Sequence, residues 1–128
     1  PVNTAGVHAL SYPLGSMFHL SHGLSNALLL PYVMQYNLEA DPKKYAQVAL
    51  ALGCEKGATD LITAKLGVEK VQELIASCGI PARLHELGIT KESIPEMAAA
   101  AMKIQRLLQN NPRLIEEKDA IAIFESAF

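Results

Sequence analysis

The feature that most constrains the fold is the absence of any stretch in which apolar and polar residues alternate, the pattern of a half-buried β-strand. Ala and Leu are abundant instead, aromatic residues make up only 5% of the chain, and half of the residues are hydrophobic. A chain of 128 residues is long enough to bury roughly two-thirds of its unfolded surface. No repeat and no linker-like stretch divides it. We therefore predict an all-α, compact multi-helix bundle, with residues 1–128 forming a single helical domain.

Proline and serine residues suggest where the first helices end and begin. We expect a first helix over residues 2–10 that ends before Pro13, because the ring of a proline disfavours helical geometry at the preceding residue. The hydroxyl of Ser21 is suited to cap a second helix that runs to about residue 36. Pro31 lies inside that helix and is expected to bend it by removing one backbone donor.

Two further helices are indicated by similar signals. Asp41 followed by proline predicts an N-cap and the start of a helix over residues 42–52, which Gly53 ends by adopting a left-handed conformation. Residues 58–78 carry an apolar face at helical spacing. Gly67 lies in the middle of this region and is expected to split it into two pieces.

The remaining chain is expected to be helical as well. Ser93 and Glu96 have the spacing of a capping box, in which each side chain bonds a free backbone amide at the start of a helix. Gly88 is expected to end a single helical turn. The predicted segments are residues 83–87, 93–107 and 117–126.

Composition excludes several classes of partner. The net charge is −2, with 11 basic and 13 acidic side chains, so no basic surface for nucleic acid or anionic membranes is expected. No apolar run of 18 residues occurs, and a membrane span is therefore not predicted. Cys54 and Cys78 do not form a C-x-x-C motif, which favours two reduced thiols and a cytoplasmic location. The chain begins at Pro1 without a methionine, and we expect that a preceding segment is missing.

Three of the four histidines, His8, His19 and His22, lie within the first 22 residues. A reversal of the chain near Pro13 would bring the imidazoles of His8 and His22 together, and such nitrogen ligands suit first-row transition metals. Two ligands are too few for a stable metal site. From spacing alone, ordinary hydrogen-bonded or surface histidines are therefore the favoured interpretation. His85 lies in a separate polar turn, and no nucleotide-binding or hydrolase motif is present.

A resemblance to a known family gives this cluster another meaning. The segments GVHALSYPLG at 6–15 and SHGLSNALLLP at 21–31 resemble the iron-containing (group III) alcohol dehydrogenases. Shorter matches to the same family occur at GIPARL 79–84, LGI 87–89 and NPR 111–113. The resemblance implies the C-terminal helical domain of the dehydroquinate synthase-like, iron-containing alcohol dehydrogenase fold. In that fold an N-terminal α/β domain binds the nicotinamide cofactor, and a metal ion lies between the two domains.

The resemblance also implies roles for individual residues. His8 and His22 fall on two metal-ligand positions, whereas the family's other two ligands, an Asp and a His in a D-x-x-x-H arrangement, are absent from this chain. Tyr12 takes the place of a histidine that many members carry near the nicotinamide. Leu107 is expected to line the substrate pocket or the core. His19 matches no ligand position and is expected near the metal ligands or at the surface.

The function implied for the intact enzyme is hydride transfer between a small alcohol or aldehyde and NAD or NADP. The implied metal is a divalent ion, with iron preferred and zinc as the alternative. The chain alone is expected to be inactive, to need the missing N-terminal domain as its partner, and to form a homo-oligomer as relatives do. The alternative hypothesis is a stand-alone helical interaction module whose two histidines are relics of the family.

Overall fold

The fold is seen in a computed structural model that describes residues 5–104 and 115–128, the side chains of Ala5 and His8 excepted. Within these residues the regular elements are all helical, and no strand occurs. The α-helices are α1 (Ala5–Phe18), α2 (His22–Asn37), α3 (Pro42–Ala51), α4 (Asp60–Ser77), α5 (Ile94–Met102) and α7 (Glu117–Ala127). Two short 3-10 helices, η2 (Leu84–Leu87) and η3 (Lys91–Ser93), lie between α4 and α5. The predicted all-α fold class is confirmed.

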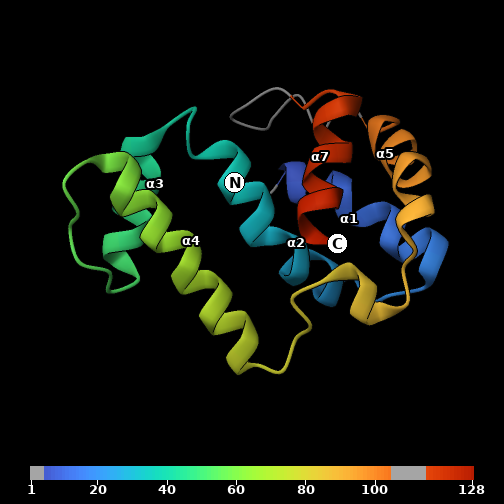
Figure 1. The fold of residues 1–128 in the computed structure, drawn as a ribbon, viewed down its shortest axis with the longest axis horizontal. Coiled ribbons are helices and arrows are strands. Elements are labelled where there is room, and N and C mark those ends of the chain that lie inside the picture. The colour runs from blue at the N-terminus through green and yellow to red at the C-terminus, as the bar shows by residue number, and fades with distance from the viewer. Residues whose placement is uncertain (1–4, 105–114) are drawn as a thin grey trace.

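The main core lies among α1, α2, α5 and α7. Helix α1 packs against α2 and α5, and α7 packs against α5 and α2. Figure 1 shows these helices grouped on one side of the molecule. The largest fully enclosed apolar side chains of this core include Leu10, Leu14, Leu29, Met97 and Phe124. Burial of such side chains supplies the main driving force for folding.

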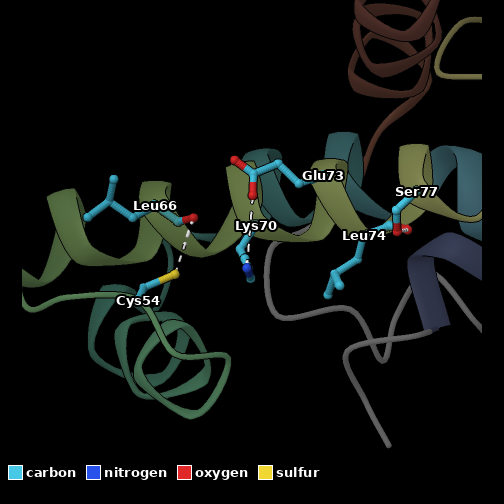
Figure 2. Close-up of polar contacts among 6 residues, drawn as sticks. All are labelled: Cys54, Leu66, Lys70, Glu73, Leu74 and Ser77. Carbon is cyan, nitrogen blue, oxygen red and sulfur yellow. Dashed lines mark hydrogen bonds and ion pairs between the residues drawn. The ribbon is translucent and has the colours of Figure 1, made fainter.

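Helices α3 and α4 form a separate hairpin at the far end of α2, which Figure 1 shows on the opposite side from α5. They pack closely against each other, and α4 also contacts α2. A second, smaller core holds the hairpin together and consists of Leu38, Tyr45, Ala64 and Val68. Figure 2 shows polar contacts of α4, where the Cys54 thiol donates to the Leu66 carbonyl oxygen at 3.5 Å. The Lys70 ammonium lies 4.0 Å from the Glu73 carboxylate in the same view.

Several predicted boundaries are confirmed. The hydroxyl of Ser21 accepts the Leu24 amide at 3.2 Å and caps α2. The carboxylate of Asp41 accepts the Lys44 amide at 3.2 Å, with proline at the first position of α3. Gly53 has a φ of 90° after α3, in the left-handed region that only glycine adopts without strain. Each of these ends is determined by the chemistry of one or two adjacent residues.

The predicted end of the first helix before Pro13 is wrong, because α1 continues through this residue to Phe18. Proline inside a helix removes one hydrogen bond and costs about 3 kcal/mol. Pro13 is buried, and the neighbouring side chains Leu10 and Leu14 are 0% exposed in the main core. Packing of α1 against α2 and α5 outweighs the local cost of the proline.

The predicted break at Gly67 is also wrong, since α4 is one uninterrupted helix from Asp60 to Ser77. Gly67 is buried in this helix and faces Ala49 of α3. A β-carbon at position 67 would lie 2.7 Å from the β-carbon of Ala49, closer than real side chains approach. The glycine therefore permits close helix packing and does not end a helix.

The capping box predicted for Ser93 and Glu96 is not formed. Ser93 has helical backbone angles and no capping hydrogen bond, and its hydroxyl lies 2.8 Å from that of Thr90. Helix α5 begins with Ile94 and ends at Met102. The predicted extension to Leu107 lies outside the described residues.

The turn that carries His85 joins the C-terminal end of α7. The guanidinium of Arg83 donates to the Ser126 carbonyl oxygen at 2.8 Å, and His85 Nδ1 is hydrogen-bonded to the Phe128 carbonyl oxygen. The rings of His85 and Phe128 pack with their centroids 5.6 Å apart. These contacts link η2 to α7 across a long stretch of sequence, and they engage His85 away from the N-terminal histidines.

Among the described residues, no helix combines the length and the apolar character needed to cross a bilayer. Cys54 and Cys78 are both free thiols.

Candidate metal-binding site between α1 and α2

His22 is the first residue of α2, and the hydrogen bonds around it fix the start of this helix. Besides capping the helix, Ser21 accepts a hydrogen bond from the Ser25 hydroxyl to its carbonyl oxygen at 2.9 Å. Ser25 is buried, whereas His22 is exposed. The start of α2 is therefore held by short-range hydrogen bonds while the imidazole of His22 stays accessible.

The imidazole of His22 has a defined partner one turn further along α2. The side-chain amide nitrogen of Asn26 lies 2.9 Å from Nε2 of His22. The amide oxygen Oδ1 of Asn26 is enclosed and has no hydrogen-bond partner among the described residues. Positions i and i+4 lie on the same face of a helix, so the contact follows directly from the spacing of the two residues.

A hollow of about 250 Å³ lies between α1 and the start of α2. His22 and Tyr12, two of the predicted site residues, both line it. The Tyr12 side chain is 57% exposed, so its phenol is available to a neighbouring molecule. Among the described residues, the lining consists of Ser11, Tyr12, Gly15, Ser16, Leu20, His22 and Ser25. The resemblance had indicated Tyr12 and His22, and the serine residues are additions from the structure.

The structure gives less information on the other two predicted site residues, His8 and Leu107. His8 belongs to α1, one helical turn before Tyr12, and its side chain lies outside the described part of the structure. Leu107 also lies outside the described residues. Metal ligation by His8 and a pocket role for Leu107 therefore stay predictions.

The other two histidines, His19 and His85, do not line this hollow. His19 is exposed and has a φ of 57°, in the left-handed conformation that ends α1. Its backbone amide donates to the Gly15 carbonyl oxygen at 3.0 Å, and the Leu20 amide donates to Leu14 at 3.3 Å, a pattern that closes helix ends. His19 thus terminates α1, where glycine is the usual residue.

The residues present fit a metal ion only in part. Imidazole nitrogen suits iron or zinc, and His22 lines the hollow. The described residues contain no group of three or more His, Cys, Asp or Glu side chains that would hold a metal. Because a stable site needs three or four protein ligands, a metal ion here would need ligands beyond those that the described residues supply.

A second hollow, of about 510 Å³, was not anticipated from the sequence. It lies between α2, α4 and residues 82–83, and it is lined in part by Tyr32, Glu69, Glu73 and Arg83. The Tyr32 hydroxyl donates to the Ala82 carbonyl oxygen at 2.6 Å. Burial raises the pKa of Tyr32 above its ordinary value of 10.0, an effect that the Arg83 charge opposes and the Glu86 charge reinforces. None of the residues that the structure describes along this hollow is a histidine, and it shares no described lining residue with the candidate metal site.

Comparison with known proteins agrees with the fold. A family profile described as "Fe-containing alcohol dehydrogenase family, C-terminal" matches residues 2–128. Long-chain-alcohol dehydrogenase 1 of Geobacillus thermodenitrificans is 41% identical over 125 residues, which cover 97% of this chain and 32% of that protein. The 1,3-propanediol dehydrogenase of Citrobacter freundii is 38% identical over 127 residues, which cover 98% of this chain and 33% of that protein.

Solved structures give the same result. A crystal structure of 1,3-propanediol oxidoreductase superposes with a TM-score of 0.91 and 37% identity, over 96% of this chain and 32% of the other. An alcohol dehydrogenase from Oenococcus oeni gives a TM-score of 0.89 at 34% identity, over 95% and 32% of the two chains. This chain thus spans about a third of the length of these relatives. It belongs to the Fe-containing alcohol dehydrogenase family and corresponds to the C-terminal helical part of its members.

Proposed function

We propose that this chain is the metal-ligand-bearing helical domain of an NAD(P)-dependent alcohol dehydrogenase. The observation that carries the proposal is that His22 and Tyr12 line one hollow between α1 and α2, in a chain that the family profile matches from residue 2 to residue 128. His8, one turn before Tyr12, is the second imidazole ligand in this proposal. The substrate class is a small alcohol or aldehyde.

The chemistry divides between this chain and other parts of the enzyme. A divalent metal ion in such a site supplies a Lewis acid that lowers the pKa of a bound alcohol. His8 and His22 would supply imidazole nitrogens as ligands to such an ion. In this proposal the phenol of Tyr12 donates a hydrogen bond to substrate or cofactor. The nicotinamide accepts or donates the hydride and requires an N-terminal α/β domain as partner.

The proposal also covers the metal ion, the hydride carrier, the oligomeric state and the location of the enzyme. Iron is the proposed ion because of the family, and zinc is the alternative because imidazole binds both. We propose NAD or NADP as the hydride carrier and a homo-oligomer as the working form. Two free thiols fit a cytoplasmic enzyme.

A second candidate function is a stand-alone helical interaction module that keeps the histidines as relics. The incomplete donor set favours it, since the described residues contain no group of three potential ligands. The two functions differ in what they require of His22. Only the dehydrogenase needs this side chain for metal binding and turnover.

The test compares two histidine variants in the enzyme assembled with its α/β domain. His22→Ala is expected to lose bound metal and nearly all NADH-forming alcohol oxidation. His19→Ala is the matched control, because His19 is a nearby exposed histidine outside the lining of the hollow. It is expected to retain both metal and activity. Full metal content and full turnover in His22→Ala would overturn the dehydrogenase proposal, and turnover by the 128-residue chain alone would show that no further domain is needed.

A further inference from the structure

Gly15 of α1 lacks the structural reason that accounts for most glycines of this chain. The structure describes the surroundings of seven glycines. Three of them have positive φ angles, a conformation that other residues rarely adopt, and at two more a β-carbon would lie 2.7 Å from a neighbouring side chain. The glycines explained in this way are Gly53, Gly57, Gly67, Gly79 and Gly88. Of the seven, Gly15 and Gly23 remain.

Alanine would fit at position 15. A β-carbon there would lie 3.5 Å from the Leu20 carbonyl oxygen, which is an ordinary van der Waals contact. Gly15 lies inside α1, where alanine is a better helix former than glycine because it restricts the unfolded chain. A β-carbon would fit at Gly23 as well, but of these two glycines Gly15 alone lines the hollow between α1 and α2. A residue that departs from the local preference without a packing reason is expected at a functional site.

The hollow is small enough for one side chain to change what it can hold. Its volume of about 250 Å³ lies below the range of about 300–1,000 Å³ that is usual for small-molecule pockets. Among its described lining residues, Gly15 and Leu20 carry no polar side-chain group, whereas the others carry a hydroxyl or an imidazole. Gly15 follows Tyr12 by three positions, so both lie on the same face of α1. A ligand with one polar end and a hydrocarbon chain matches this lining.

We propose that Gly15 is a specificity-determining residue, which leaves room in the hollow for the carbon chain of a primary alcohol. The carbon chain lies against Gly15 and Leu20, and the hydroxyl faces Tyr12 and His22. A larger side chain at position 15 takes up this space and shortens the longest alcohol that the hollow admits. The identity of the ligand rests on the proposed function, whereas the steric effect of position 15 can be measured as binding alone.

The test compares hexanol with ethanol in the enzyme assembled with its α/β domain. Without nicotinamide no hydride is transferred, so a titration followed by NMR of the alcohol reports binding alone. Gly15→Ala is expected to weaken hexanol binding about tenfold, the usual effect of one methylene in an apolar pocket, and Gly15→Val is expected to weaken it further. With NAD or NADP present, the ratio of kcat/KM for hexanol to that for ethanol is expected to fall by a similar factor.

Gly23→Ala is the matched control, because it adds the same methyl group to a helical glycine outside the described lining of the hollow. It is expected to leave hexanol binding and the ratio of kcat/KM values unchanged. Gly15→Ala is expected to be at least as stable as the wild type in urea, because alanine favours the helix. A less stable Gly15→Ala protein would show that the fold itself needs this glycine and would overturn the proposal.

Two outcomes of the alcohol measurements would overturn it as well. One is hexanol binding that does not respond to the residue at position 15, and the other is a loss of kcat/KM that is equal for hexanol and ethanol, as loss of metal would produce. Hexanol binding that depends on position 15 without any turnover would contradict the proposed function and support this inference. Turnover with an unchanged ratio would do the reverse, so the failures of the two proposals are distinguishable.

Discussion

Gly67 of α4 lies directly against Ala49 of α3. A β-carbon at position 67 would be 2.7 Å from the Ala49 β-carbon and 3.1 Å from its α-carbon, so backbone as well as side chain limits the space. This contact brings together the two helices of the hairpin whose small core contains Tyr45 and Val68. The packing of α3 on α4 thus depends on the absence of a side chain at one position.

Gly67→Ala is expected to destabilise the protein by about 1–3 kcal/mol, the usual cost of overpacking. Alanine favours a helix over glycine by about 1 kcal/mol, so intrinsic propensity alone predicts the opposite sign. Gly23→Ala is the matched control, because Gly23 lies in α2 and a β-carbon there meets nothing within 4 Å. The control is expected to be neutral or stabilising in urea unfolding. A Gly67→Ala protein at least as stable as the wild type would contradict the packing argument.

Local chemistry predicted the helix boundaries that depend on adjacent residues. The caps at Ser21 and Asp41 are correct because each side chain bonds an amide three residues later. Pro13 and Gly67 were misread as breaks, because their meaning depends on residues far away in the sequence. Pro13 is tolerated by burial in the main core, and Gly67 is required by Ala49. Packing between residues that are far apart in the sequence cannot be detected from a few neighbouring residues.

The candidate site, too, could be predicted from the sequence only in part. Spacing alone favoured ordinary histidines, and only the resemblance to a family singled out His22 and Tyr12, which share one hollow. The contact between His22 and Asn26 was not predicted, although their separation of four positions on a helix is the signal that would have found it. The described residues contain no group of three potential metal ligands, so the full ligand set of a metal site could not be read from them.

Arg83→Ala is expected to destabilise the protein by about 1 kcal/mol, because it removes the hydrogen bond from the guanidinium to the Ser126 carbonyl oxygen at 2.8 Å. That bond helps to hold η2 against the end of α7. Lys118→Ala is the control, since Lys118 is exposed and lies 4.0 Å from Glu116 in a surface pair worth little. Urea unfolding of both variants checks the prediction. Equal stability of the two variants would show that the Arg83 contact contributes nothing.

The stability contributed by Tyr32 is expected to depend on pH in the alkaline range. Burial raises the pKa of Tyr32 in the folded protein, so the folded state favours the neutral phenol that donates to Ala82. The contribution is therefore complete below the unfolded pKa of about 10 and is lost as the pH rises through the higher folded value. Tyr32→Phe is expected to cost up to about 1 kcal/mol at neutral pH. The difference from the wild type should shrink above about pH 10, because only the wild type loses this neutral phenol.

Unfolding curves of wild type and Tyr32→Phe at several pH values test this expectation. Tyr45, whose pKa burial also raises, is present in both proteins, and its effect cancels in the difference. A difference that stays constant or grows above pH 10 would contradict the assigned role of Tyr32.

Tyr12→His is expected to change the pH dependence of the assembled enzyme without changing its stability. The side chain is 57% exposed, and substitutions at such positions usually alter the free energy of unfolding by less than about 0.5 kcal/mol. Histidine has an ordinary pKa of about 6.5, so the substitution brings a group that titrates near neutral pH to the hollow beside His22. The kcat/KM for alcohol oxidation should then gain a transition between about pH 5.5 and 7.5 that is absent in the wild type.

Tyr12→Phe separates this effect from a change in shape, because it removes the hydroxyl and adds no titrating group. Its pH profile should follow the wild type, with a lower kcat/KM if the phenol donates a hydrogen bond to substrate or cofactor. Identical profiles for Tyr12→His and the wild type would mean that position 12 does not face the reacting groups, although it lines the hollow. In that case the hollow would serve metal binding through His22 alone.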